Sequence, residues 1–273
     1  MDGDGTPLQI SAPRVRQFGP VNWLGLWTLY LREVQRFWKV GMQTIAAPVV
    51  TTLLFLAIFL MAMAGQQRIV GGVPFLQFLA PGLIMMAMVQ NAFANTTSSL
   101  MIAKFQGSIV DLLMPPMSPL ELTLGLALGG VTRGLVVGVV VAGAMALVVP
   151  VHIVAPGLML FHAVAASLLL SVLGIMGAIW ADKFDHIAAV TNFVVTPLSF
   201  LSGTFYSIDR LPPAWHFIAF WNPFFYMIDG FRASFIGHAD GSIAVGLAVM
   251  TGLDLALLAA CHWMIASGYK LKA

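Results

Sequence analysis

The chain has 273 residues, of which 59% are hydrophobic and 9% are charged, whereas soluble globular chains carry about 25% charged residues. A water-soluble domain of this size needs more polar side chains to cover its surface, so the composition excludes that class. A single cysteine, Cys261, excludes an internal disulfide and a cysteine-based metal site, and no basic tract interleaved with aromatics indicates nucleic acid as a partner. We therefore predict an all-α membrane protein, in which the placement of the few charges matters more than their net sum of +2.

The first 40 residues divide into a polar segment and an amphipathic segment. Residues 1–20 are rich in glycine, proline and polar side chains and contain no apolar run, so we expect a disordered cytosolic tail and not a signal peptide. In residues 21–40, five side chains recur at helical spacings of three and four: Trp23, Trp27, Tyr30, Val34 and Trp38. This pattern predicts an amphipathic helix that lies in the membrane interface just before the first span.

Residues 41–270 form the predicted transmembrane domain. A membrane span needs about 20 predominantly apolar residues, and six segments meet this requirement. They are residues 45–64, 75–95, 121–149, 157–180, 187–202 and 243–267. With both termini inside, nine lysines and arginines lie in cytosolic segments, three lie in external segments, and Arg133 lies within a span. The positive-inside rule therefore predicts that both termini face the cytosol.

The segment between the second and third spans, residues 96–119, is polar and is cytosolic in this topology. An apolar stripe at helical spacing runs along it, and prolines end the predicted helix. The stripe consists of Phe105, Ile109, Leu112 and Leu113, and the prolines are Pro115, Pro116 and Pro119. Such a helix could dock into a groove on a partner protein or lie on the membrane surface, and the residues alone leave both alternatives open.

The stretch between the fifth and sixth spans, residues 203–240, is the least regular part of the chain. Prolines break it into apolar pieces that are too short to cross a membrane. We expect a re-entrant or interfacial segment there, because irregular backbone exposed to lipid is not tolerated within the hydrocarbon region. The aromatic side chains of this stretch suit the headgroup region: Phe205, Tyr206, Trp215, Trp221 and Tyr226.

Two charged residues lie deep within predicted spans. Arg133 and Asp254 are about 18 Å and about 20 Å from the cytosolic ends of the third and sixth spans, at a rise of about 1.5 Å per residue. An unpaired charge at such depth is costly, so we expect each residue to have a partner or to contact water. Three alternatives remain open: an ion pair between the two, a polar point on a transport path, or separate partners.

The third span also carries a face of small residues at intervals of four: Gly130, Gly134, Gly138 and Ala142. Small residues allow two helix backbones to approach closely in lipid. We expect this face to pack against another helix of the same chain, with a dimer interface as the alternative.

Motifs for enzymatic chemistry are missing from the sequence. It contains no GxxxxGK[ST] phosphate loop, no HExxH and no GxSxG. The chain is therefore not expected to be an enzyme or to bind a cofactor or metal. Any ATP and Mg²⁺ that drive it must be bound by a second polypeptide.

Four segments resemble ABC-2 type permeases. Two of them, residues 197–213 (PLSFLSGTFYSIDRLPP) and 221–232 (WNPFFYMIDGFR), flank the irregular stretch. The others are residues 78–84 (FLAPGLI) in the second span and residues 103–116 (AKFQGSIVDLLMPP), which are similar to the family's first cytosolic loop. The resemblance covers nearly the whole chain and is closest to the branch that includes YadH-like permeases and nodulation-factor exporters.

The resemblance implies a function that the composition does not show. It implies the permease subunit of an ATP-binding cassette exporter in the bacterial inner membrane, which forms the translocation path as a homodimer driven by a separate ATPase subunit. The family's coupling helix, which docks into the ATPase, would correspond to Lys104, Phe105, Ile109, Asp111 and Leu112. The family's external re-entrant segment would include Trp215, Trp221, Asn222, Pro223 and Arg232.

Two alternatives from other classes remain open beside this implication. An ATP-independent channel or secondary carrier would be active without an ATPase subunit, and an assembly protein would transport nothing. Many secondary carriers are built from repeated halves, and no repeat is visible in this chain, which weakens the carrier alternative. The sequence does not identify a substrate.

Overall fold

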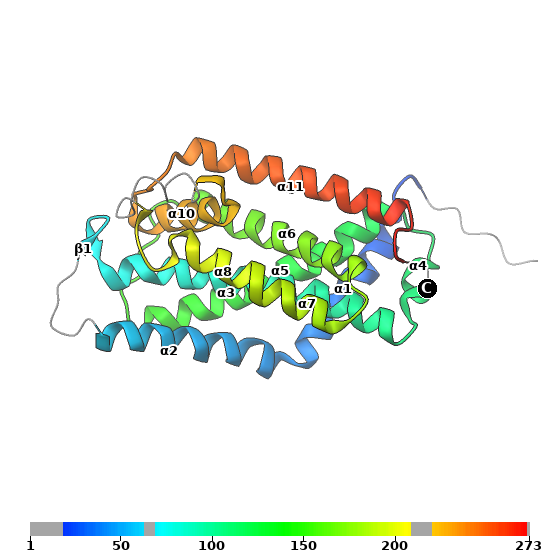
Figure 1. Ribbon diagram of the computed structural model, residues 1–273, viewed down its shortest axis with the longest axis horizontal. Coiled ribbons are helices and arrows are strands. Elements are labelled where there is room, and N and C mark those ends of the chain that lie inside the picture. The colour runs from blue at the N-terminus through cyan, green and yellow to red at the C-terminus, as the bar shows by residue number, and fades with distance from the viewer. Residues whose placement is uncertain (1–18, 63–68, 209–219, 272–273) are drawn as a thin grey trace, which may run out of the picture.

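The computed structural model describes residues 19–62, 69–208 and 220–271, and there the chain is a bundle of long helices (Figure 1). Six helices are long and apolar enough to cross a membrane, which confirms the predicted number of spans. They are Met42–Ala62, Phe75–Phe105, Pro119–Ala146, Pro156–Trp180, Phe184–Thr204 and Ile243–Ala266. All but the last two residues of the expected tail, residues 1–20, lie outside the described part of the chain.

The elements follow one another with short connections. The first half of the chain consists of α1 (Trp23–Lys39), the π-helical turn η1 (Met42–Ala46), α2 (Ala47–Ala62), the strands β1 (Ile69–Val70) and β2 (Val73–Pro74), α3 (Phe75–Phe105), α4 (Ile109–Leu113) and α5 (Pro119–Ala146). The second half consists of α6 (Pro156–Trp180), α7 (Phe184–Val190), η2 (Thr191–Val195), α8 (Thr196–Ser199), η3 (Phe200–Thr204), α10 (Pro223–Ile236) and α11 (Ile243–Ala266). Strands β1 and β2 pair antiparallel at one end of the bundle.

The fifth span consists of four short helical pieces because a proline and a glycine interrupt it. Pro197 has no backbone N–H to donate and its ring displaces the carbonyl one turn earlier, so the regular hydrogen-bond ladder cannot run through it. The π-helical turn η2 ends immediately before α8, which contains this proline. Gly203 then takes a left-handed conformation, with φ of 79°, and ends the span.

Helix α3 continues to Phe105, ten residues beyond the predicted end of the second span at residue 95. The polar residues that suggested a loop are accommodated because their hydroxyl groups bond to carbonyls of the same helix. Thr97 Oγ1, for example, donates to the carbonyl of Phe93 at 2.8 Å. The helix ends only where Gly107 adopts a left-handed conformation, with φ of 71°. The prediction of a loop beginning at residue 96 was therefore wrong.

Helices α3, α5 and α6 pack most closely and form the centre of the bundle. The small residues of α5 make this possible. A Cβ atom on Gly130 would meet the Oγ of Ser171 on α6 and lie 3.0 Å from the carbonyl oxygen of Ala92 on α3. One on Gly134 would lie 2.9 Å from the Oγ of Ser167. The small-residue face is thus occupied within the chain, which favours the expected packing role over a dimer interface.

Helices α2 and α11 cover opposite sides of this centre (Figure 1). Little of either helix is buried. Large apolar side chains on their outer faces are exposed, among them Leu54 and Ile58 on α2 and Leu255 and Trp263 on α11. Because a membrane span exposes such faces only to lipid or to other protein, both sides of the bundle are available for these contacts.

We predict that Gly130→Leu destabilises the bundle by about 1–3 kcal/mol, because the added side chain would overpack the contact with Ser171 and Ala92. The matched control is Gly143→Leu on the same helix, where a Cβ atom meets nothing within 4 Å. Thermal denaturation in detergent, followed by size-exclusion chromatography, measures both. Equal loss from the two variants would show that α5 does not approach its neighbours as described.

Candidate functional site

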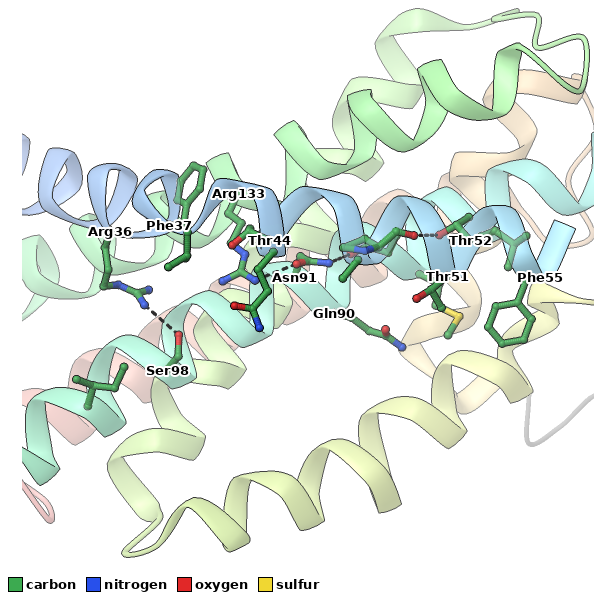
Figure 2. Close-up of a pocket in the computed structure, with 18 residues that line it drawn as sticks. Arg36, Phe37, Thr44, Thr51, Thr52, Phe55, Gln90, Asn91, Ser98 and Arg133 are labelled. Atoms are coloured by element: carbon green, nitrogen blue, oxygen red, sulfur yellow. Dashed lines mark hydrogen bonds between the residues drawn. The ribbon is translucent and has the colours of Figure 1, made fainter. Parts of the chain in front are cut away.

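A pocket of about 730 Å³ lies beneath α1, between α2, α3 and α5 (Figure 2). We call it the α1 pocket. Its wall is formed by 18 residues, which include Arg36, Thr44, Phe55, Met86, Asn91 and Arg133. Its volume falls within the range of about 300–1,000 Å³ that is usual for small-molecule sites.

Helix α1 is fastened to α3 by a buried charged network at one end of this pocket. Glu33 is fully buried, and its carboxylate accepts a hydrogen bond from Ser99 Oγ at 2.7 Å. Arg36 Nη2 lies 3.2 Å from the same carboxylate and donates to the backbone oxygen of Asn95 at 2.6 Å and to its side-chain oxygen at 3.0 Å. A buried carboxylate is stable only when it is paired and hydrogen-bonded, so this network fixes the position of α1.

Helix α1 buries a narrow stripe that contains Glu33 and exposes its tryptophans. The buried residues of the helix are Leu29, Glu33 and Phe37. Trp23, Trp27 and Trp38, which the spacing placed on one face, are 72%, 55% and 64% exposed. A helix is present at Trp23–Lys39, and its three tryptophans point away from the bundle, whereas Tyr30 of the same predicted face is half-buried and shares a hydrogen bond with Thr132 on α5 at 3.1 Å.

Arg133 reaches the α1 pocket from α5. Its Nη2 donates to the Oδ1 of Asn91 on α3 at 3.0 Å, and both side chains appear in the middle of the pocket in Figure 2. The Nε of Arg133 is buried and has no hydrogen-bond partner in the described part of the chain. The Arg133 guanidinium therefore lies deep within a membrane span, and its hydrogen-bond partner is a neutral amide.

The expected ion pair between Arg133 and Asp254 is not formed. Asp254 lies on the buried face of α11 with Met250 and Cys261, and this helix packs mainly on α6 and α10. Its Oδ1 atom is buried without a partner among the described residues. The pair was one of three alternatives and was suggested by similar depth and opposite charge. Depth does not fix the direction in which a side chain leaves its helix, and here Arg133 faces the α2 side of the bundle while Asp254 belongs to the opposite side.

The residues expected to form one coupling helix lie instead on two helices. Lys104 and Phe105 end α3, and Ile109, Asp111 and Leu112 belong to α4. Lys104 Nζ donates to three carbonyl oxygens at the C-terminal end of α6, those of Ala178, Ile179 and Ala181, at 3.1, 3.0 and 2.7 Å. This joins the end of α3 to the end of α6, where a cation also complements the helix dipole.

The apolar stripe predicted along this segment does not form a single exposed face. Ile109 and Leu112 are buried, whereas Phe105 is 55% exposed and stacks on Phe184 with ring centroids 4.7 Å apart. The turn at Gly107 breaks the helical register on which the stripe depended. The exposed apolar residues of the segment also include Val110 and Met114, which the sequence pattern did not single out.

At the opposite end of the bundle, α10 is held by side chains that the sequence marked as part of an external segment. Asn222 caps the helix by accepting from the backbone N–H of Phe224 at 3.1 Å, and Pro223 is the first helical residue. Trp221 is 76% exposed. Trp215 lies outside the described residues.

Arg232 of α10 is buried and joins three elements. Its Nε donates to the backbone oxygen of Phe78 on α3 at 3.1 Å, and its Nη2 donates to that of Gly203 in η3 at 2.5 Å. The guanidinium carbon also lies 3.8 Å from the centre of the Phe78 ring, within the range of a cation–π contact.

The site contains polar residues that sequence reasoning missed. Glu33, Asn91 and Asn95 hold α1 and Arg133 in place, and none of them was predicted to do so. The sequence contains one feature that could have identified the two asparagines. They are one helical turn apart in a span that lacks charged residues, so they share one face of that helix.

A bundle of six potential membrane spans with a pocket between its helices is the architecture of a membrane permease. Residues 25–236, most of the chain, match the family model described as ABC-2 type transporter. The chain belongs to this family.

Relatives agree with this assignment along almost the whole chain. The chain is 35% identical over 251 residues to the inner membrane transport permease YadH of Escherichia coli K12, an alignment that covers 92% of this chain and 98% of the relative. YadH of Shigella flexneri matches to the same extent. Nodulation protein J of Rhizobium leguminosarum bv. viciae is 25% identical over 237 residues, covering 85% of this chain and 89% of the relative.

The chain is therefore the transmembrane permease of an ABC-2 type transporter, a multi-pass protein of the inner membrane. ATP is hydrolysed by a separate subunit, and the permease itself binds no cofactor. In the described part of the chain, no group of three or more His, Cys, Asp or Glu residues is placed to hold a metal ion. Family membership sets aside the alternatives of an ATP-independent channel or carrier and of an assembly protein.

A double-mutant cycle tests the placement of the two intramembrane charges. We expect Arg133→Ala and Asp254→Ala to act additively, with a coupling energy below about 0.5 kcal/mol, because the two side chains do not meet. Arg133→Ala and Asn91→Ala share a hydrogen bond and should be non-additive. Unfolding by sodium dodecyl sulfate in mixed micelles measures all the variants. A large coupling energy between Arg133 and Asp254 would show that the two side chains do form an ion pair.

Arg232→Lys should lower the free energy of unfolding by about 1.5–3 kcal/mol, because an ammonium group cannot reproduce the two-element bridge of the guanidinium. The control is Arg32→Lys, since the side chain of Arg32 is 49% exposed. The same unfolding assay measures both. A stability loss no larger than that of the control would mean that Arg232 does not hold α10 in place.

Proposed function

We propose that two copies of this permease assemble with two copies of the ATPase subunit, and that the complex exports its substrate from the cytosol. The distribution of lysine and arginine supports a cytosolic location for both termini. The start of α1 and the C-terminal end of the described chain lie at the same end of the bundle, as an even number of spans requires (Figure 1). In this orientation α4 faces the cytosol.

The observation that carries the proposal is a set of exposed apolar side chains at this cytosolic end. Phe105, Val110 and Met114 are 55%, 55% and 74% exposed, and Asp111 is exposed next to Val110. We call these four residues the coupling surface. Apolar residues exposed together beside charged ones are typical of a protein interaction site, and the ATPase is the partner that the family supplies.

The contacts beneath the coupling surface support its role in transmitting motion. Ile109 and Leu112 anchor α4 in the core, and Lys104 joins the end of α3 to the end of α6. A displacement of the coupling surface by the ATPase would therefore move α3 and α6 together. Because α3 also contributes Asn91 to the α1 pocket, the motion would reach that pocket.

We further propose that α1 lies in the cytosolic membrane interface, as part of a segment from residue 21 to residue 40 that precedes the transmembrane domain at 41–270. Its exposed tryptophans support this placement, since indole rings prefer the headgroup region. The tail at residues 1–20 would extend into the cytosol.

On the external side we propose a re-entrant segment that includes α10. This helix has 14 residues, too few to cross a bilayer. It begins at a capped turn at Asn222 and ends at Gly237 in a left-handed conformation. The buried bridge from Arg232 to α3 and η3 supports a position inside the bundle at the external end.

The homodimer in this proposal is supported by the uncovered surface of the bundle. Helix α2 exposes Val50, Leu54 and Ile58, and it borders the α1 pocket. A second copy or lipid must cover this face.

In a complex with the ATPase, mass measurement of the detergent-solubilised assembly should give two permease chains for two ATPase chains.

The ATPase contact is tested by the double substitution Val110→Asp and Met114→Asp. We expect the ATPase subunit to co-purify with the tagged wild-type permease from its native host and to be lost from this variant, because two charges would be buried in an apolar contact. Both side chains are exposed in the isolated chain, so the permease itself should still fold.

The matched control is Leu147→Asp, which changes an exposed leucine at the C-terminal end of α5. It should retain the ATPase. Retention of the ATPase by the Val110→Asp and Met114→Asp variant would refute the coupling surface. Purification of the wild type as a dimer without any ATPase would refute the proposed assembly as a whole.

A further inference from the structure

The α1 pocket is basic at one end and apolar at the other. Arg36 and Arg133 line it, and none of its 18 lining residues is an aspartate or glutamate. Figure 2 shows Arg36 toward one end of the pocket, Phe55 at the other end, and Arg133 between them on the side of Arg36. The pocket therefore has the polarity of a site for an amphipathic molecule.

The charges at the basic end are incompletely balanced. The buried carboxylate of Glu33 lies 3.2 Å from Arg36 and 3.5 Å from Arg32, so two arginines share one negative charge. Arg133 has only the amide oxygen of Asn91 as a partner, and its Nε donor is buried with none in the described residues. A guanidinium has five N–H donors, so most of the hydrogen-bonding capacity of Arg133 is unused.

A cation at this depth has a high cost unless an anion or water compensates it. The chain provides no carboxylate among the lining residues to do so. Water in the cavity or the anionic group of a ligand can compensate the cation, and a ligand anion does so with a full opposite charge. Guanidinium groups bind phosphate and carboxylate with geometric specificity.

The other end of the pocket fits a hydrocarbon chain. It is lined by Phe55 of α2 and by Leu83, Met86 and Ala87 of α3. Thr51 and Thr52 also lie beside Phe55, and the hydroxyl of Thr52 donates to the carbonyl of Pro48 within α2. These residues belong to two spans, so the apolar end extends along the hydrophobic part of the membrane. A small free anion would leave this part of the cavity empty.

We infer that the α1 pocket binds an amphipathic anion, with its phosphate or carboxylate headgroup at Arg133 and Arg36 and its apolar chain between α2 and α3. An exported cargo and a lipid of the bilayer could both supply such a headgroup and chain. The identification of the molecule as the cargo rests on the proposed function, whereas the existence of the binding site does not depend on it.

The first experiment measures binding to the purified permease alone. Native mass spectrometry in detergent gives the occupancy by phosphatidic acid and, separately, by phosphatidylcholine with the same acyl chains. We expect phosphatidic acid to bind about tenfold more tightly, because only its headgroup carries a net negative charge for the unbalanced guanidinium.

Two variants assign this preference to the pocket. Arg133→Gln removes the unbalanced charge and should abolish the tenfold preference. Gln90→Glu adds a carboxylate to the lining and leaves every arginine in place. Gln90 makes no hydrogen bond with the described residues, so its replacement breaks no contact there, and this variant should abolish the preference as well. If Arg133→Gln fails to fold, Gln90→Glu decides the question. Lys39→Gln is the control, since Lys39 is an exposed cation on α1 that does not line the pocket, and it should keep the preference.

Equal binding of the two lipids by the wild type, or an unchanged preference in Gln90→Glu, would overturn the inference. Neither result depends on the ATPase, so the inference and the proposed function can fail separately.

A second experiment distinguishes cargo from bilayer lipid. The permease and its ATPase are reconstituted in phosphatidylcholine vesicles, and ATP hydrolysis is measured with and without phosphatidic acid. We expect phosphatidic acid to raise the rate in the wild type and not in Gln90→Glu. An unchanged wild-type rate would overturn the assignment to cargo and identify the ligand as a bound lipid of the bilayer.

Discussion

Lipid tails are as apolar as leucine side chains, so the burial of apolar surface cannot by itself hold the spans of this protein together. Close contact and hydrogen bonds must do so. Both are concentrated on α3, whose backbone approaches α5 at Gly130, and whose Thr96 hydroxyl donates to the carbonyl of Ser171 on α6 at 2.8 Å. The remaining elements take their positions from this three-helix centre.

Three buried or partly buried cations connect the outer elements to that centre by the same chemistry. Arg36 fastens α1 to α3, Lys104 joins the ends of α3 and α6, and Arg232 holds α10 against α3 and η3. In each case, backbone carbonyls accept from the cation. A charge placed in this way costs little, since its donors are satisfied, and it fixes the relative position of elements that lipid could not hold together.

Arg133 differs from these three cations because its donors are mostly unused. That contrast separates a structural arginine from one available to a ligand. Helix α3 also links the α1 pocket to the coupling surface, since it carries both Asn91, the partner of Arg133, and Phe105.

The sequence was sufficient to predict the class, the number of spans and the family, because these depend on composition and on local motifs. The prediction was wrong where the outcome depends on the direction of side chains between helices. The depth of Arg133 and Asp254 suggested a pair, and the spacing from Phe105 to Leu112 suggested one stripe. The packing of α11 on the far side of the bundle and the turn at Gly107 decided otherwise, and neither can be read from periodicity.

Helix α1 is held in place by contacts that have a consequence for biosynthesis. Its contacts are made with residues that are synthesised much later: the backbone N–H of Asn22 donates to Glu121, 99 residues on, and Tyr30 bonds to Thr132, 102 residues on. At about 5–20 residues per second, α1 waits roughly 5–20 s after leaving the ribosome before α5 is complete. During that interval its tryptophan face can keep it at the membrane surface, so that the first helix made is among the last to take its final place.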